Sequence, residues 1–593
     1  MSNDKTGAGS TRREFLTGLT AAAAAATVAG ALTQTANAQM PAPRINRNAK
    51  GQPYNILFVF TDQERFDKPT PRGLSLPGHE RLKRTGTTFL NHYIGAVMCS
   101  SSRANLMTGL HTPDNKIFEN LNVPWVKDLS TDLPTYGKMM QKSGYYAAYK
   151  GKWHLSRAFD EGVTDRLFTK EMEAYGFQDY ASPGDLVGHT LGGYQFDDLI
   201  SGSAVTWLRR HGAPLNDQGK PWCLTTSLVN PHDIMYFDSD APGQKVQNNG
   251  RLLAHSAPAP NHPMYKAKWN AALPDSLGQA LDAPGRPGAH REYQTAWDLL
   301  LGHIPNEKPR WERFTDYYIN CIRAVDQQLV RMFAELDALG MSDRTIIVFT
   351  ADHGEMAGGH GLRGKGPFAY EDCIHVPLYV VHPDVKGGQS CNALTSHIDI
   401  APTLMGMAGV DAGKVAELAG RKLPGKDFTP LLNAPAKADA NAIRESVLFT
   451  YSGLATNDSN VLKVISDAAA KGANPRDPAT IAKLGLQPDL KKRGTLRTMF
   501  DGRYKFSRYF APVDRHSPTS MDQLVKNNDI ELFDLKSDPK EMTNIAVGPK
   551  SDPKLVMAMS NKLEAVIKAE IGVDDGREMP EFKTITWELD SVD

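Results

Sequence analysis

The stretch from Val97 to Gly109 holds the residues whose types and spacing point most directly to chemistry. Small hydroxyl residues follow Cys99 and lead into a helical pattern that Gly109 ends. This pattern places Cys99 and Ser100 near a helix N-terminus, where free amides and the helix macrodipole stabilise an anion and favour a thiolate over a thiol. Cys99 is therefore a candidate nucleophile, although a lone cysteine is more often a buried structural residue.

Three apolar runs end in polar residues that could bind a metal or an anion. After the runs 55–60, 345–350 and 221–229 come, in turn, Asp62 with Gln63, Asp352 with His353, and His232. Such runs are typical of strands buried on both faces of a parallel sheet. Since open α/β sheets build their sites at the carboxyl ends of strands, these side chains are expected to meet at one edge. Turn-forming Asp and Asn are the ordinary explanation for any one run, but a weaker one for three.

The Cys99 segment resembles the signature of the type I sulfatases, in which this cysteine is oxidised to formylglycine before the enzyme works. Ordered motifs extend the resemblance over most of the chain: Asp62-Gln63, Gly151-Lys152-Trp153-His154, His232, Asp352-His353-Gly354, Lys365, Ser396-His397-Ile398-Asp399 and Glu531-Leu532-Phe533-Asp534. The resemblance implies an alkaline-phosphatase-like α/β fold, in which helices flank a large, mostly parallel sheet and a smaller C-terminal α+β domain contains an antiparallel sheet.

The resemblance also implies which residues form the site. The metal ligands would be Asp62, Gln63, Asp352 and His353, and the catalytic residues Cys99, Arg103, Lys152, His154, His232 and Lys365. These mostly hard ligands suit one divalent cation that acts as a Lewis acid. Calcium is the usual ion of the family. Gln63 and His353 stand where the family often has Asp and Asn. The total ligand charge is therefore lower and an imidazole is present, so manganese or zinc could also be the bound ion.

The mechanism implied by the family is nucleophilic catalysis with general acid help. Hydrated formylglycine would attack sulfur, His232 or Lys365 would protonate the departing alcohol, and His154 or Arg103 would help to expel sulfate. The family's modification motif reads Cys-x-Pro-x-Arg, or Ala in place of Pro, whereas this chain has Ser101 at that place. Either a formylglycine-generating or other maturase tolerates Ser101, or Cys99 stays a thiol. We expect conversion, because the rest of the site is intact.

The function predicted from these motifs is a sulfuric ester hydrolase, similar to an arylsulfatase, that cleaves a small-molecule sulfate monoester. A phosphonate monoester or phosphodiester hydrolase of the same superfamily shares the motifs and remains the alternative. A non-catalytic binding protein with a vestigial site is the alternative from another class. Tyr236, Tyr265 and Trp269 could stack on a substrate at the pocket mouth, or could be scattered surface aromatics.

Residues 1–38 read as a twin-arginine type signal peptide. Arg12 and Arg13 precede an apolar, Ala-rich run, and Ala36-Asn37-Ala38 has the small-x-small form of a cleavage site. We expect cleavage and not a membrane anchor, because the run is short and alanine is only weakly apolar. The protein is then periplasmic or secreted, exported folded, and without membrane attachment after signal removal.

The elements that must position these residues follow from the rest of the chain. We predict a catalytic α/β domain over 52–440, with a helix from about 311 to 339, and a smaller α+β subdomain over 441–593, with strands at 447–451, 498–500 and 504–506 and a helix from about 553 to 571. Two Pro-containing or polar stretches, 236–310 and 454–495, read as insertions of loops with short helices.

The composition limits the remaining classes of function. The 593 residues include 67 basic and 67 acidic side chains, so the chain lacks the basic excess on which nucleic-acid binding depends. Five cysteines without a Cys-x-x-Cys pair indicate neither a disulfide framework nor a zinc knuckle. The sequence is compatible with a homo-oligomer.

Overall fold

The computed structural model describes residues 46–582 and Ile585, except 49–50, 67–70, 160–166, 183, 186–189, 250–251, 476 and 550. The signal-peptide prediction for residues 1–38 lies outside these residues. Arg44–Asp593 forms one compact unit, and the division at residue 440 stays a prediction. Within the described part of the chain, no helix combines the length and the apolar character needed to cross a membrane.

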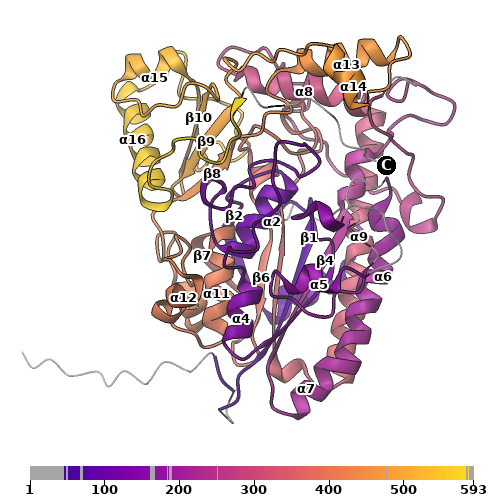
Figure 1. The fold of residues 1–593 in the computed structure, drawn as a ribbon, viewed down its shortest axis with the longest axis vertical. Helices are drawn as coiled ribbons and strands as arrows, with labels where there is room; N and C mark the ends of the chain where they lie inside the picture. Colours follow the sequence, from indigo (N-terminus) through magenta and orange to yellow (C-terminus); the bar gives the residue numbers. More distant parts are fainter. Residues whose placement is uncertain are drawn as a thin grey trace, which may run out of the picture. The chain divides into compact units, whose positions relative to one another are not determined.

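The larger of two sheets has seven strands in the order β3-β4-β1-β5-β6-β2-β7 (Figure 1). Its strands are β1 (Asn55–Asp62), β2 (Thr87–Tyr93), β3 (Tyr146–Gly151), β4 (Trp222–Pro231), β5 (Thr345–Ala351), β6 (Leu378–Val381) and β7 (Gln389–Ser396). β3, β4, β1 and β5 run parallel, as do β2 and β7, while β6 is antiparallel to both of its neighbours. The predicted large, mostly parallel sheet is confirmed.

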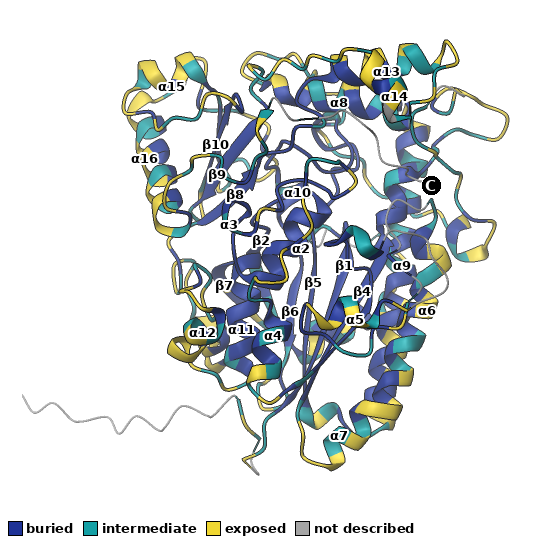
Figure 2. Cartoon of the chain, viewed as in Figure 1, coloured by how far each residue is buried: buried dark blue, intermediate teal, exposed yellow. Residues whose placement is uncertain are grey.

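Helices cover both faces of this sheet, which explains the continuous apolar runs. All eight residues of β1 are buried, and they alternate between the two faces. Phe58 and Phe60 face the core under α2 (Cys99–Thr108), α4 (Tyr136–Lys142) and α11 (Ile400–Met407). Leu57 and Val59 face the core under α1 (Pro77–Thr85), α6 (Gly192–Trp207) and α9 (Lys308–Ala338). Figure 2 shows the strands buried between these two layers.

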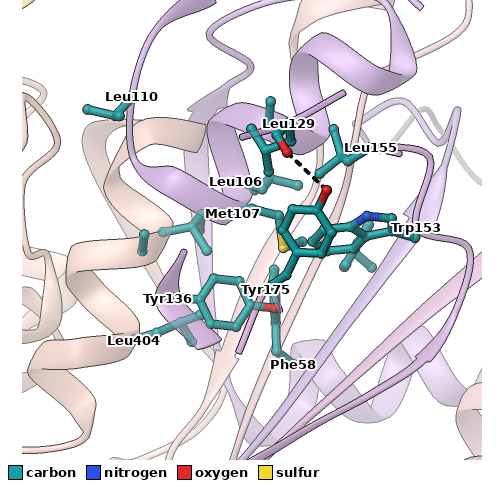
Figure 3. Close-up of a cluster of buried hydrophobic side chains, with 14 of the residues drawn as sticks. Phe58, Leu106, Met107, Leu110, Leu129, Tyr136, Trp153, Leu155, Tyr175 and Leu404 are labelled. Atoms are coloured by element: carbon teal, nitrogen blue, oxygen red, sulfur yellow. Dashed lines mark hydrogen bonds between the residues drawn. The ribbon is translucent and has the colours of Figure 1, made fainter. Parts of the chain in front are cut away.

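Figure 3 shows the core that holds α2 against the sheet. Leu106 and Met107 of α2 belong to the same buried cluster as Phe58 of β1 and Leu404 of α11. The helix has no solvent-exposed face, because all ten of its residues are buried. Since Cys99 is its first residue, this packing fixes the position of the candidate nucleophile.

The second sheet is antiparallel, with the order β11-β10-β9-β8. It consists of β8 (Val447–Tyr451), β9 (Thr495–Phe500), β10 (Tyr504–Phe510) and β11 (Asp529–Asp534), accompanied by α15 (Met521–Asn527) and α16 (Pro553–Glu570). Apolar side chains of α16 pack on this sheet. The predicted C-terminal α+β region with an antiparallel sheet is therefore confirmed.

Most of the remaining helices are short, and α8 (Gly288–Leu301) is the longest of them at 14 residues. They are α3 (Thr112–Asn115), α5 (Thr169–Glu173), the π-helix Leu208–Gly212, α7 (Ala213–Asp217), α8, α10 (Glu371–Ile374), α12 (Ala412–Ala419), α13 (Ser459–Ala469) and α14 (Pro478–Lys483), besides single 3₁₀ turns. The stretches 236–310 and 454–495 form loops with short helices, as predicted. Trp269 and Tyr265 pack near α9: the Trp269 indole donates to Asn320 Oδ1 at 2.9 Å, and Tyr265 lies 5.7 Å from the Tyr317 ring.

Candidate active site

Four neighbouring parallel strands end at one place, and polar residues follow each of them. Asp62 ends β1, Lys152 follows β3, His232 follows β4 and Asp352 follows β5. The backbone amide of Asp352 donates to the carbonyl of Thr61 at 3.0 Å, which joins the ends of β1 and β5. The carboxyl edge of the sheet thus gathers the residues that the apolar runs predicted.

Three ligand-type side chains surround the Cys99 thiol. One ligand atom each from Asp62, Cys99, Asp352 and His353 lies within 4.8 Å of the others, and all four residues are buried. The Cys99 sulfur lies 3.2 Å from His353 Nε2 and 3.7 Å from Asp62 Oδ1. Burial and the negative charge of Asp62 raise the pKa of Asp352 to about 6. Two carboxylates and an imidazole at this separation are a donor set that a divalent cation fits.

Two buried cations neutralise these carboxylates. The Arg103 guanidinium donates to Asp62 Oδ2 and Asp352 Oδ2, each at 2.9 Å. The Lys152 ammonium donates to Asp62 Oδ2 at 2.7 Å. Burial alone would raise the pKa of Asp62, but Lys152 above all, and Arg103 with it, holds that pKa well below its ordinary value. Asp62 is therefore ionised and acts as an acceptor at neutral pH.

Gln63 is fixed by partners on both ends of its amide. Lys365 Nζ donates to Gln63 Oε1 at 2.7 Å, and Gln63 Nε2 donates to Glu355 Oε2 at 2.5 Å. The Gln63 backbone amide also donates to Asp352 Oδ1 at 3.1 Å. Glu355 therefore sets which end of the amide faces Lys365. Sequence reasoning missed Glu355, although it lies directly after the Asp352-His353-Gly354 motif.

The His154 ring is buried without a partner. Among the residues that the structure describes, neither of its ring nitrogens makes a hydrogen bond. Burial, and then the charge of Lys152, holds the pKa of His154 well below its ordinary value, so the ring is neutral. Its backbone amide donates to Asp185 Oδ2, and the amide of Trp153 donates to Asp185 Oδ1 at 3.1 Å. Asp185 has no motif signal and was also missed.

His232 lies in the same charged environment. Burial and the charge of Lys152 hold the pKa of His232 well below its ordinary value. The ring lies 5.7 Å from the ring of Tyr236. The structure thus gathers all ten predicted site residues at this edge of the sheet.

Further residues hold the N-terminal end of α2. Ser102 Oγ donates to the carbonyl of Asp352 and lies 2.9 Å from His397 Nδ1. The amide of Ser100 donates to Asn120 Oδ1 at 3.2 Å. Sequence reasoning gave Ser102 and His397 places in motifs but no role, and it missed Asn120.

The fold and the site together define an alkaline-phosphatase-like α/β hydrolase, with a candidate nucleophile at a helix N-terminus beside carboxylates and buried cations. The profile of the Sulfatase family matches residues 54–410. The chain belongs to the sulfatase family and is a sulfuric ester hydrolase.

Individual relatives are distant but match over most of their length. The chain is 23% identical to the N-acetylglucosamine-6-O-sulfatase of Bacteroides thetaiotaomicron, over 83% of this chain and 82% of that protein. It is 24% identical to the choline-sulfatase of Rhizobium meliloti, over 84% of this chain and 83% of that protein. Among solved structures, the phosphonate monoester hydrolase of Agrobacterium radiobacter has a TM-score of 0.58 at 19% identity and covers 86% of this chain and 95% of its own. This last likeness concerns the fold.

Proposed function

We propose that the protein hydrolyses a sulfate monoester with a formylglycine, formed from Cys99, as its nucleophile. The observation that carries this proposal is the position of the Cys99 sulfur, 3.2 Å from His353 Nε2 and 3.7 Å from Asp62 Oδ1, among buried carboxylates and cations. A sulfate ester gains negative charge on its oxygens in the transition state, and preorganised positive charge stabilises that state.

We propose that Asp62, Asp352 and His353, which cluster around Cys99, hold one divalent ion together with Gln63. Calcium is the family's usual ion, and manganese and zinc are the alternatives. When bound, the ion supplies Lewis-acid polarisation, and the formylglycine supplies a hydroxyl nucleophile. Arg103 uses its guanidinium to hold the two carboxylates, which fits a charge-positioning role better than proton transfer.

Three other residues suit proton transfer and charge stabilisation. The neutral His154, with free ring nitrogens among the described residues, suits a proton acceptor during sulfate release. Lys365 donates hydrogen bonds and suits the departing alcohol oxygen better than His232, because His232 is neutral in the free enzyme. Lys152 adds positive charge beside Asp62.

We propose that the modification of Cys99 precedes folding. Cys99 is 1% exposed, and every residue of α2 is buried, so a maturase cannot reach the thiol in the folded protein. Export of the folded chain by the twin-arginine route, read from residues 1–38, allows this step to occur in the cytoplasm. The mature enzyme is then periplasmic or secreted.

Mass spectrometry of the peptide that contains Cys99, from protein of the native host, tests the proposal. We expect an aldehyde in place of the thiol. We also expect Cys99→Ala to abolish turnover of an aryl sulfate with little change in melting temperature, whereas Cys391→Ala, on β7, retains turnover. An unmodified thiol together with undiminished turnover by Cys99→Ala would refute the nucleophile. The ratio of turnover on aryl sulfate to turnover on an aryl phosphonate decides between sulfate ester hydrolysis and the phosphonate or phosphodiester alternative; a higher turnover on the phosphonate would favour the alternative.

A further inference from the structure

A cavity of about 110 Å³ is lined in part by Met98, the residue before the candidate nucleophile. We infer that it receives the leaving group, and that this group is an uncharged, apolar alcohol no larger than about one ring. The inference rests on the proposed sulfatase function and names its substrate class.

The cavity is lined by residues that adjoin the proposed catalytic residues in the chain or contact them. Met98, which precedes Cys99, lines it, and so do Met235 and Tyr236. Met235 Sδ lies 3.6 Å from Lys365 Nζ, the candidate proton donor to the leaving alcohol. An alcohol held in this cavity would therefore be close to the chain segment that carries the nucleophile and to a residue that contacts the candidate acid.

Part of its wall comes from the two insertions. Trp297 and Leu301 of α8 and Leu253 belong to the stretch 236–310, and Leu462 of α13 belongs to the stretch 454–495. Tyr293 stacks on Trp297 with ring centroids 5.0 Å apart, which holds the indole in place. An apolar cavity of roughly 150 Å³ can stay dry and hold benzene. The walls and the size together favour one apolar ring or its equivalent.

A positively charged leaving group fits this cavity poorly. Glu119 is the acidic residue in the lining, and its carboxylate already accepts three hydrogen bonds: from the amides of Leu454 and Ala455 at 3.0 and 3.1 Å, and from the Trp125 indole at 3.2 Å. Burial raises the pKa of Glu119. A cation could contact the aromatic faces, but it would lose its water without gaining an uncommitted anion.

A sugar leaving group also fits poorly, because the cavity offers few hydrogen-bond partners for its hydroxyl groups. Each buried hydroxyl needs a hydrogen-bond partner, and one left without a partner weakens binding. Asn120 lines the cavity, but its Oδ1 already accepts from the amide of Ser100 at 3.2 Å. Apart from the tyrosines and the donor of the Trp297 indole, Asn122 and Thr456 are the other uncharged side chains in the lining with hydrogen-bonding groups. These are too few for a ring with several hydroxyls.

Matched sulfate esters test the class of leaving group. Choline sulfate and 3,3-dimethylbutyl sulfate have nearly the same shape and are both primary alkyl sulfates, but only choline carries a charge. We expect kcat/KM of the wild-type enzyme to be roughly tenfold or more higher for 3,3-dimethylbutyl sulfate than for choline sulfate or N-acetylglucosamine 6-sulfate. A preference for either of the latter two overturns the inference.

A cavity-filling variant tests the location. Ala254 lines the cavity, and its backbone amide is held by the Leu300 carbonyl at 3.0 Å. Ala254→Phe should lower kcat/KM for 3,3-dimethylbutyl sulfate by roughly tenfold or more, while activity on methyl sulfate changes by less than about twofold. Ala272→Phe, at an exposed position of the same insertion, is the matched control. Equal effects on both substrates, or no effect, would place the leaving group elsewhere.

Calorimetric binding of the product alcohols separates this inference from the proposed function. We expect 3,3-dimethylbutanol to bind more strongly than choline, and Ala254→Phe to lose this binding. That result supports the cavity assignment even if no sulfate ester is hydrolysed, in which case only the proposed function is refuted. Hydrolysis of sulfate esters without this binding preference leaves the function standing and overturns the cavity assignment.

Discussion

Two site residues, Gln63 and His154, have backbones in the left-handed region, with φ of 75° and 58°. A residue other than glycine pays roughly 1–2 kcal/mol for this conformation, so its surroundings must hold it there. The Tyr318 hydroxyl donates to the Gln63 carbonyl at 2.8 Å, and Asp185 accepts the His154 amide. Each turn aims a polar side chain into the site directly after a strand.

Ser101 is the residue at which this chain departs from the family's modification motif, and proline should be tolerated there. It lies in the first turn of α2, where backbone amides have no carbonyl partner within the helix. Its hydroxyl is buried and has no partner among the described residues. We expect Ser101→Pro to raise the fraction of formylglycine measured by mass spectrometry, with kcat rising in proportion and KM unchanged. Equal conversion in both proteins would mean that the maturase does not distinguish them.

His353 should decide which ion the site prefers. Treatment with a chelator should abolish turnover, and addition of Ca²⁺, Mn²⁺ or Zn²⁺ should restore it to different extents. His353→Asn replaces an imidazole by an amide oxygen, so the order in which the three ions restore turnover should shift in favour of Ca²⁺. Isothermal titration of the metal-free proteins measures the same order by binding. If the order is unchanged in His353→Asn, His353 is not a ligand.

At the scale of elements, two carboxylates tie the end of β4 to the start of α6. Asp233, just after β4, accepts the amides of Gly193 and Tyr194, both at 2.8 Å. Asp197, on α6, accepts the amides of Val229 and Asn230 at 2.7 and 2.9 Å. Each carboxylate thus accepts the free amides of the other element: Asp233 those at the start of α6, and Asp197 those at the end of β4. The two contacts fix the chain on both sides of His232.

Removing one of these ties should damage both stability and activity. Asp197→Ala leaves two buried amides without an acceptor, which should lower the free energy of unfolding by about 2–4 kcal/mol. Because His232 follows these amides, kcat should also fall. Denaturant unfolding and steady-state kinetics measure the two effects. Asp198→Ala, at the exposed neighbouring position, should change both far less; a similar loss in the two variants would contradict the proposed tie.

At the scale of the whole molecule, buried charged groups join the C-terminal sheet to the catalytic region. Glu531 of β11 accepts the Tyr370 hydroxyl at 3.0 Å and the Tyr509 hydroxyl at 2.8 Å. Lys505 of β10 pairs with Glu371 at 2.6 Å. Burial raises the pKa of Glu531 to about 7, although the two tyrosine hydroxyls oppose this shift.

This carboxyl should make stability depend on pH. Because the pKa of Glu531 rises from its ordinary 4.5 to about 7 on folding, the native state binds the proton more tightly. Its contribution to stability is therefore complete below about pH 4.5 and is lost as the pH rises through about 7, by at most about 3 kcal/mol. In Glu531→Gln, the unfolding free energy from urea titrations should fall less between pH 5 and pH 8 than in wild type. The exposed Glu417→Gln should behave as wild type; a similarly steep fall in Glu531→Gln would contradict the assignment.

The sequence by itself determined the large α/β sheet, the antiparallel C-terminal sheet and the position of the proposed site residues at the strand ends. This was possible because those signals are local. A doubly buried strand must be continuously apolar, and the polar residue that ends it is a chain neighbour, as Asp62 is for β1 and Asp352 for β5.

The tertiary structure alone decided which residues support the site and which residues line the cavity near it. Glu355 meets Gln63 across 292 positions of the chain, and Asp185 holds His154 across 31. Trp297 and Leu462 line one cavity although they lie in separate insertions, while Trp269 packs elsewhere. The physical reason is that hydrogen bonds and packing depend on distance in space, and no local periodicity records which distant side chains folding brings together.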